Sequence, residues 1–184
     1  LSEGSVPAWH ILAVTFTKRA AREMRHRLDQ MVGDLSTRSM ALGTFHATCA
    51  RILRREAEYV DLTSDYLIFD SDDQLALMKQ VVKAMDLDDK RYRPRSILNA
   101  VSSAKNEMLT PVEFPLHTYY DEIVARVYDR YQEALRANGG VDFDDLLMET
   151  AHLFRENPNV LDRYQDRYRH ILVDEFQDTN MAQY

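Results

Sequence analysis

The sequence lacks several features that mark whole classes of proteins. Its single cysteine, Cys49, excludes an internal disulfide. No apolar run approaches the roughly 18 residues of a membrane span. No apolar segment follows a charged leader, so we expect a cytoplasmic protein. None of the five glycines precedes a lysine, so the phosphate-binding loop G-x-x-x-x-G-K-[ST] is absent. The chain also lacks an initiator methionine, and we therefore expect a fragment.

Size and charge set the next limits. The 184 residues, 45% of them hydrophobic, suffice for one ordinary core or for one core with a small satellite domain. A formal net charge of −7 argues against a protein that coats nucleic acid with a generally basic surface. The charge is uneven, because residues 16–55 hold nine Lys or Arg against three Asp or Glu. The acidic total therefore leaves room for a local basic patch.

The first part of the chain begins with the pattern of a strand and a helix. Residues 11–16 indicate a strand, and a helix is expected from Lys18, with Gly33 as its C-cap. The buried face of this helix is predicted from residues spaced by three and four: Ala21, Met24, Leu28 and Met31.

A second strand and helix follow. Residues 39–42 indicate the strand, Gly43-Thr44 a turn, and residues 46–58 a helix. Its inward-facing residues are expected to be Ala50, Leu53 and Ala57. Strand, helix, strand, helix is the order of a parallel α/β sheet.

From residue 66 the pattern changes to helices, with no convincing strand between them. The longest of these helices is expected to end at Asn138-Gly139-Gly140. Helices over 142–154 and 160–168 then lead back to a sheet strand at Ile171. We therefore divide the chain into three parts: residues 1–65 as the first part of an α/β domain, 66–140 as a helical insertion, and 141–184 as the return to the sheet.

The stretch around which the chain is organised lies near its end, at residues 170–180. Three aliphatic residues there, 171–173, predict a short strand buried on both faces, and Asp174 and Glu175 follow at its tip. An Asp at a strand tip can hold Mg²⁺ on a nucleotide, and an adjacent Glu can take a proton from an attacking water. An acidic pair alone is more typical of a solvated turn after a core strand.

Two strand-to-helix turns carry candidate nucleic-acid contacts. At the first, Thr15 and Phe16 end a strand, and Lys18 with Arg19 begin a helix, where backbone N–H groups attract phosphate. Phe16 can stack on an unpaired base. At the second turn, Thr44 and His46 can donate to phosphate oxygens. The structural alternative is a core phenylalanine beside solvated cations, and a locally hydrogen-bonded histidine.

Two further groups are weighed in the same way. We assign Asp142, Asp144 and Asp145 to capping of a helix N-terminus rather than to a metal, because no His or Glu joins them at ligand spacing. Lys90 and Arg91 begin a basic run that ends at Arg95, and such a run is usually a solvated face.

Three segments, in order, resemble motifs of the superfamily 1 DNA helicases of the UvrD/Rep/PcrA type. VDEFQDTN, residues 173–180, resembles the Walker B segment. AVTFTKRAAREM, residues 13–24, resembles motif Ia, although the family usually has Asn-Lys where this chain has Lys18-Arg19. GTFHATCARILRR, residues 43–55, resembles the DNA-contacting motif that follows. The resemblance extends from about Ile11 to Tyr184.

The resemblance implies a partial RecA-like parallel sheet with a mostly helical insertion domain. It implies a parent that is an ATP-dependent 3′ to 5′ DNA helicase using ATP and Mg²⁺. Asp174 would hold the metal, Glu175 would position water, and Gln177 would join them at the catalytic site. The fragment itself is expected to bind no cofactor and to be inactive, because it lacks the phosphate loop.

The resemblance also implies partners, namely single-stranded DNA and junctions of single-stranded with duplex DNA. Phe16 would contact a base, Phe143 would help form a pocket for an unstacked base, and Lys90 with Arg91 would approach duplex DNA. Two alternatives stay open at this point: a non-enzymatic DNA-binding or interaction module on the same scaffold, and a piece of a nuclease-linked helicase of the AddA/RecB type.

Overall fold

The computed structural model describes residues 6–184, apart from the side chains of residues 34–36. It divides into two units. The first unit contains the described residues up to Ile52 together with Ala151–Thr179, and the second contains Leu53–Thr150 with Asn180–Tyr184. The expected α/β class is confirmed, because short parallel strands alternate with helices in both units.

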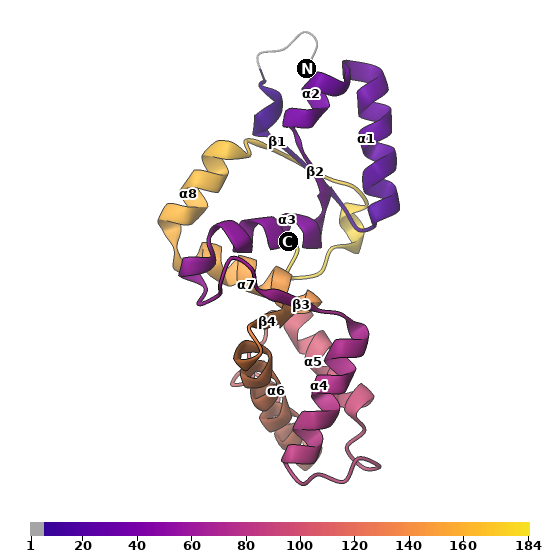
Figure 1. Cartoon of the computed structure of the whole chain (residues 1–184), viewed down its shortest axis with the longest axis vertical. Helices are drawn as coiled ribbons and strands as arrows, with labels where there is room; N and C mark the ends of the chain where they lie inside the picture. The colour runs from indigo at the N-terminus through magenta and orange to yellow at the C-terminus, as the bar shows by residue number, and fades with distance from the viewer. Residues whose placement is uncertain (1–5) are drawn as a thin grey trace. The chain divides into compact units, whose positions relative to one another are not determined.

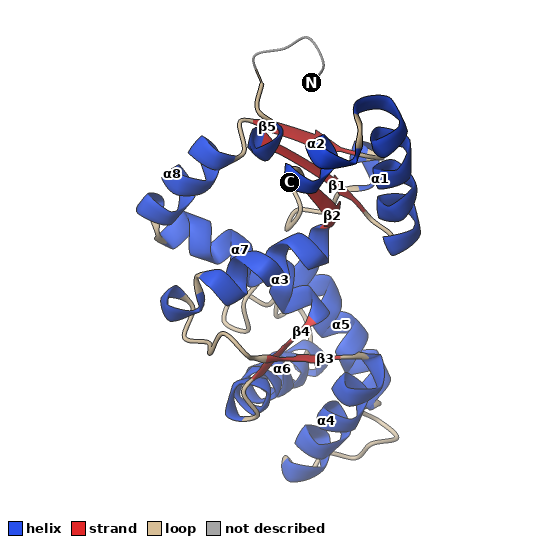
Figure 2. Cartoon of the chain, turned by 45° about the horizontal axis from the view of Figure 1, so that its top comes forward, coloured by secondary structure: helices blue, strands red, loops and turns tan. Residues whose placement is uncertain are grey.

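The first unit is built on a three-stranded parallel sheet with the order β2-β1-β5 (Figures 1 and 2). Its described elements are η1 (Ala8–His10), β1 (Ile11–Thr15), α1 (Lys18–Val32), α2 (Asp34–Ser39), β2 (Ala41–Thr44), the larger part of α3 (Phe45–Arg55), α8 (Pro158–Arg167), β5 (His170–Val173) and η3 (Phe176–Asp178). Leu12 pairs with Ala41 on one side and with Ile171 on the other, so β1 is the central strand.

Helix α1 lies along this sheet, as its pattern predicts (Figure 1). Met24 and Leu28 pack against a small core of Ile11, Ala13, Met40 and Leu42. Gly33 ends the helix with φ 83°, which confirms the predicted C-cap. The prediction is wrong for Met31, which is 78% exposed. The 15 residues of α1 span about 22 Å at 1.5 Å per residue, whereas the five residues of β1 span about 17 Å. The last turn therefore extends past the sheet.

Two other details of the sheet differ from expectation. Gly43 and Thr44 belong to β2 rather than to a turn, because the parallel ladder continues until Thr15 pairs with Thr44. Strand β5 is not buried on both faces, since Ile171 and Leu172 are 60% and 59% exposed. Among the described strands β5 pairs with β1 alone, so it forms an edge of the sheet.

The second unit is mostly helical, as expected. Its elements are η2 (Ala57–Tyr59), β3 (Leu67–Phe69), α4 (Ser71–Ala84), α5 (Pro94–Asn106), α6 (Tyr119–Ala137), β4 (Gly140–Asp142) and the first part of α7 (Phe143–Glu156). Helices α4, α5 and α6 enclose one core, in which Met78, Ile97 and Tyr131 are fully buried. Asp70 and Thr118 begin α4 and α6 with capping boxes.

The expectation that residues 66–140 hold no strand is wrong. β3 and β4 form a short parallel pair in which Leu67 lies opposite Gly140 (Figure 2). A Cβ on Gly140 would lie 2.5 Å from the Phe69 ring, so only glycine fits this close approach. Strands of three residues are too short to show a period of two, which explains why the sequence pattern misses them.

No helix in the described part of the chain combines the length and the apolar composition that a membrane crossing requires.

Candidate functional site at the strand ends

Three parallel strands of the first unit end side by side. Thr15 of β1 pairs with Thr44 of β2, and Val14 pairs with Val173 of β5. The backbone N–H of Asp174 continues the ladder by donating to the carbonyl oxygen of Val14 at 3.0 Å. Thr44, Thr15 and Asp174 therefore lie in one row at the carboxyl ends of the strands, where parallel sheets bind their ligands.

The acidic end of this row has a fixed local conformation. Asp174 and Glu175 are both exposed, and Glu175 has the left-handed φ of 52°, which non-glycine residues seldom adopt. The Gln177 side-chain amide donates to Glu175 Oε2 at 2.5 Å, and the Thr179 hydroxyl donates to the Phe176 carbonyl at 2.8 Å. Strained residues of this kind cluster at functional sites, and here the bond from Gln177 holds the carboxylate in place.

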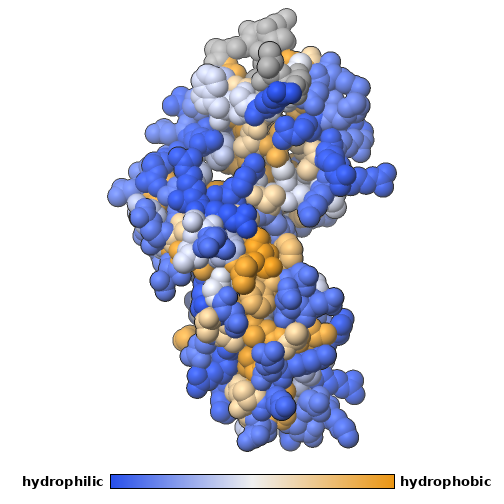
Figure 3. Space-filling model, viewed as in Figure 1, coloured by the Kyte–Doolittle hydropathy of each residue, from blue (hydrophilic) through white to orange (hydrophobic). Residues whose placement is uncertain are grey.

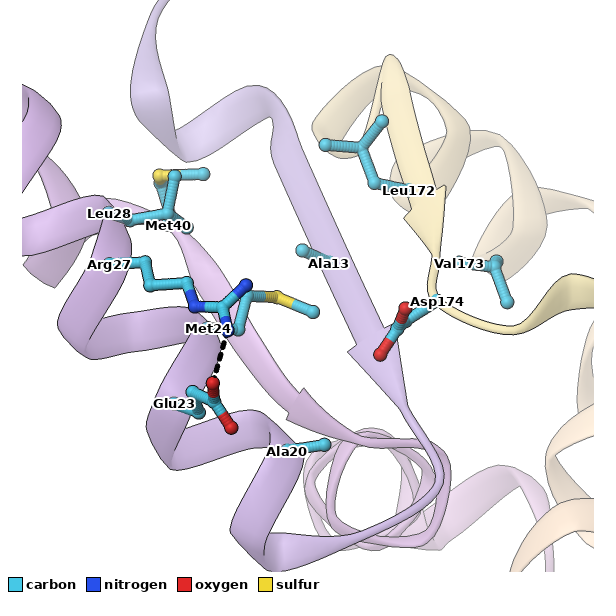
Figure 4. Close-up of a pocket in the computed structure, with 10 residues that line it drawn as sticks. All are labelled: Ala13, Ala20, Glu23, Met24, Arg27, Leu28, Met40, Leu172, Val173 and Asp174. Carbon is cyan, nitrogen blue, oxygen red and sulfur yellow. Dashed lines mark hydrogen bonds and ion pairs between the residues drawn. The ribbon is translucent and has the colours of Figure 1, made fainter.

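A hollow of about 540 Å³ lies between α1 and β5, beside Asp174 (Figure 4). Figure 4 shows the Asp174 carboxylate pointing toward α1, where Arg27 and Glu23 form an ion pair. The remaining lining is mostly apolar: Ala13, Ala20, Met24, Leu28, Met40, Leu172 and Val173. Among the residues that the structure describes, Asp174 is the carboxylate at the rim of this hollow that forms no ion pair. Carboxylate oxygens suit Mg²⁺, which one or two protein carboxylates and substrate phosphates together can hold.

The protein supplies few oxygen donors beside Asp174. Among the described residues, no group of three or more His, Cys, Asp or Glu side chains is arranged to hold a metal ion. A Mg²⁺ site at Asp174 would therefore need oxygen donors from a bound nucleotide and from water.

The first strand-to-helix turn presents its cations to solvent. Thr17 caps α1, because its hydroxyl accepts from the Ala20 N–H at 3.1 Å. Lys18 and Arg19, in the first turn of α1, are exposed, whereas Thr15 is only 2% exposed. Phe16 is half-buried, and its ring lies 5.4 Å from that of Phe45 at 51°. One part of Phe16 thus packs locally while the rest stays accessible.

The second turn is built in a similar way. The buried Thr44 hydroxyl accepts from the Ala47 N–H at 3.2 Å and so caps the start of α3. Accepting this bond leaves the hydroxyl proton available for donation. His46 follows in the first turn of α3 and is half-buried. The structure therefore brings Thr15, Phe16, Thr44 and His46 together with the acidic segment.

The other predicted contacts belong to the second unit. Phe143, the first residue of α7, is 43% exposed. Lys90 is exposed, and its backbone N–H donates to the Asp88 carboxylate at 2.9 Å. The Arg91 guanidinium lies 5.4 Å from the centre of the Tyr92 ring. These three residues are not part of the strand-end row.

The assignment of Asp142 and Asp145 to capping is confirmed. The Asp145 N–H donates to Asp142 Oδ1 at 2.9 Å, and the Asp142 N–H donates to Asp145 Oδ2 at 3.1 Å. Sequence reasoning missed their partner, Lys105 of α5, whose Nζ lies 2.7 Å from both carboxylates. The Tyr131 hydroxyl also donates to Asp142, at 3.1 Å. The sequence did carry a signal that Lys105 is buried, because Lys105 falls four residues after buried Val101 on the apolar face of α5.

Burial and charge act together on this cluster. Burial and then the neighbouring Asp145 raise the pKa of Asp142, Lys105 opposes both, and the pKa that results is about 6. Burial would also raise the pKa of Asp145, but Lys105 outweighs it and holds this pKa below the usual value. For Lys105 the desolvation is likewise outweighed by Asp145 and Asp142, so its pKa is raised. The cluster is a structural ion network rather than a metal site.

Comparison with known proteins gives a family match over the whole chain. The sequence model of the UvrD/REP helicase N-terminal domain matches residues 1–184. The protein called ATP-dependent DNA helicase PcrA in Bacillus subtilis (strain 168) is 45% identical over 186 residues, which cover 100% of this chain and 25% of that protein.

Two relatives with the same name give a similar match. The protein of Staphylococcus aureus (strain Mu50) is 42% identical over 186 residues, covering 100% of this chain and 25% of the relative. That of Leuconostoc citreum is 46% identical over 178 residues, covering 96% of this chain and 24% of the relative. The chain thus spans about a quarter of the length of these curated relatives.

Proposed function

Because the chain belongs to the UvrD/REP helicase family, we propose that it is part of an ATP-dependent helicase that moves 3′ to 5′ along single-stranded DNA. One observation carries this proposal: three motif segments meet at the carboxyl ends of the strands of one sheet. Thr15, Thr44 and Asp174 come from distant parts of the chain, and the register of β1, β2 and β5 places them in one row.

The acidic segment would serve ATP hydrolysis. Mg²⁺ bound there with ATP neutralises charge on the phosphates. Asp174 offers exposed carboxylate oxygens as its protein ligand. Glu175 would take the proton from the attacking water, and Gln177 positions its carboxylate through the 2.5 Å hydrogen bond.

The strand-to-helix turns would bind single-stranded DNA. Lys18, Arg19, the Thr44 hydroxyl and His46 supply donors and charge for phosphates. The accessible part of the Phe16 ring offers a stacking surface for a base. A half-buried, locally packed ring suits this purpose, since it is rigid before DNA arrives.

The remaining assignments concern the helical part. We divide the chain into residues 1–65 and 141–184 of a RecA-like motor domain and an inserted subdomain over 66–140. Phe143 would contact an unstacked base, and Lys90 with Arg91 would meet DNA at a junction of single strand and duplex. A cytoplasmic location fits this work on DNA.

The residues of this chain alone support DNA contact but not ATP hydrolysis, because its sequence holds no phosphate loop. Two titrations of the chain test the proposal together. We expect ATP affinity no better than millimolar by calorimetry, without DNA-stimulated hydrolysis. By fluorescence anisotropy we expect binding of a labelled oligothymidylate that weakens with salt, with a dissociation constant no better than tens of micromolar at physiological salt. Absence of DNA binding even at 20 mM salt would contradict the assigned contacts.

A further inference from the structure

Helix α1 carries its charges in an order that opposes the helix dipole. Lys18 and Arg19 stand in its first turn, where the N–H groups already present positive charge, and no acidic residue accompanies them there. No basic residue stands in its last turn. Helices α4 and α6 show the usual order, with Asp72 and Asp121 in their first turns and Lys83 and Arg136 in their last.

The cations of α1 also crowd one another. At about 100° per residue, Lys18, Arg19 and Arg25 all fall within roughly 60° of Arg22 around the helix. Like charges three and four residues apart destabilise a helix by about 0.2 to 0.5 kcal/mol per pair. Arg22 is thus the centre of an arc of like charges, which we call the basic arc. It lies opposite the face where Met24 and Leu28 pack on the sheet.

The cations of this basic arc, Lys18, Arg19 and Arg22, are open to solvent. Figure 3 shows hydrophilic side chains over α1. In the part of the chain that the structure describes, none of these three forms an ion pair, and the Arg22 Nε donates only to the Lys18 carbonyl of its own helix. The acid on the arc, Asp29, accepts a hydrogen bond from Thr37.

Charge is segregated along the chain in the same sense. Residues 1–52 and 151–179 hold 11 Lys or Arg and 10 Asp or Glu, whereas the rest holds 12 and 20. The first unit is thus nearly neutral, whereas the second is strongly negative. A polyanion is therefore repelled less by the first unit than by the second.

We propose that the basic arc of α1, centred on Arg22, binds the phosphate backbone of single-stranded DNA that continues from the strand-end site. This inference rests on the proposed function. Continuity supports it, because Lys18 and Arg19 belong both to the strand-end turn and to the arc, and Arg22 follows one turn further along α1. Every exposed side chain between residues 18 and 27 is polar or charged, so the arc offers no apolar anchor for a protein partner.

The test is a salt titration of the chain against fluorescein-labelled dT16 by anisotropy, with the helical content of each variant checked by circular dichroism. Arg22→Ala should weaken binding about fivefold at 20 mM salt and flatten the slope of log K against log salt by about 0.7. Arg22→Lys should restore the slope, since lysine binds phosphate as a point charge. Arg27→Ala is the matched control. It removes the same charge from the same helix, but Arg27 lies outside the arc and is paired with Glu23.

Each other result overturns the inference. If Lys18→Ala and Arg19→Ala flatten the slope while Arg22→Ala behaves like Arg27→Ala, the strand-end site binds DNA and the arc does not. If Arg22→Ala changes binding of a labelled polyglutamate but not of dT16, the arc serves an acidic peptide. If the wild-type chain fails to bind dT16 at 20 mM salt, the DNA contacts of the proposed function fail with it.

Discussion

The backbone N–H of Asp174 donates to the carbonyl oxygen of Val14 at 3.0 Å, although 160 residues separate the two in the chain. This bond continues the β1–β5 ladder one residue past β5. It brings the acidic segment beside the strand end that leads to Phe16 and Lys18. The segment that we propose for phosphate handling and the turn that we propose for DNA binding are therefore linked by a backbone hydrogen bond, so a shift of one would move the other.

The buried cluster of the second unit should depend on its single cation. Lys105→Met leaves Asp142 and Asp145 buried without a counter-charge, and loss of one partner from such a network costs about 3 to 5 kcal/mol. We expect a fall of that size in the free energy of unfolding at pH 7, measured by urea denaturation. Lys79→Met, at an exposed position of α4, should change it by less than about 0.5 kcal/mol. Equal effects of the two variants would show that the ion network is energetically neutral.

The Asp142 carboxyl should titrate near pH 6 rather than at its usual value of 3.8. Because its pKa is raised in the folded state, its contribution to stability is fully present below pH 3.8 and is lost as pH rises through 6. The side-chain carbon of Asp142, followed by nuclear magnetic resonance between pH 3 and 8, reports this directly. A midpoint at or below 3.8 would mean that Lys105 outweighs burial and Asp145 together.

The left-handed backbone at Glu175 should be measurable as strain. With φ 52°, a side chain there costs roughly 1 to 2 kcal/mol that glycine avoids. Glu175→Gly should therefore be more stable than Glu175→Ala by about 1 kcal/mol in urea denaturation, although both remove the same carboxylate. If the alanine variant is as stable as the glycine variant, the left-handed conformation is not kept in solution.

Stacking and charge at the first turn should separate in DNA titrations. Phe16→Ala should weaken oligothymidylate binding by about 1 to 3 kcal/mol at every salt concentration and leave the salt slope unchanged. Replacing Lys18 and Arg19 with alanine should instead flatten the slope by about 1.4, because each phosphate contact on a single strand contributes about 0.7. Tyr59→Ala, which removes a 43% exposed aromatic of the second unit, serves as the control and should change neither quantity. Unchanged binding by Phe16→Ala would leave that ring a packing residue only.

Much of the fold follows from local pattern. The strands at 11–15 and 170–173 are predicted because each holds a short apolar run, and the helix from Lys18 because its apolar residues are spaced by three and four. The exposure of Ile171 and Met31 is not predictable in this way. An apolar side chain favours burial, but whether it is buried depends on which elements pack beside it.

In the candidate site, too, local pattern predicts some residues, whereas other contacts depend on tertiary structure. Asp174 and Glu175 stand out because a carboxylate pair follows an aliphatic strand, and Lys18 with Arg19 because they begin a helix after another strand. The partner of Asp142 could not be assigned, because Lys105 lies 37 residues away and tertiary structure alone brings it to the junction of β4 and α7. The hydrogen bond from Gln177 to Glu175 likewise depends on a turn whose left-handed residue no local pattern marks.

We propose that Glu175 activates water in an ATP-dependent helicase that contains this domain. Steady-state ATPase assays with saturating single-stranded DNA, together with equilibrium ATP binding, test it most directly. We predict that Glu175→Gln lowers kcat by roughly 10² to 10⁴ and leaves ATP affinity nearly unchanged, because the amide keeps the shape but cannot accept the proton. Glu156→Gln, at the exposed end of α7, should keep normal turnover. A Glu175→Gln enzyme that retains most of its kcat would contradict the account.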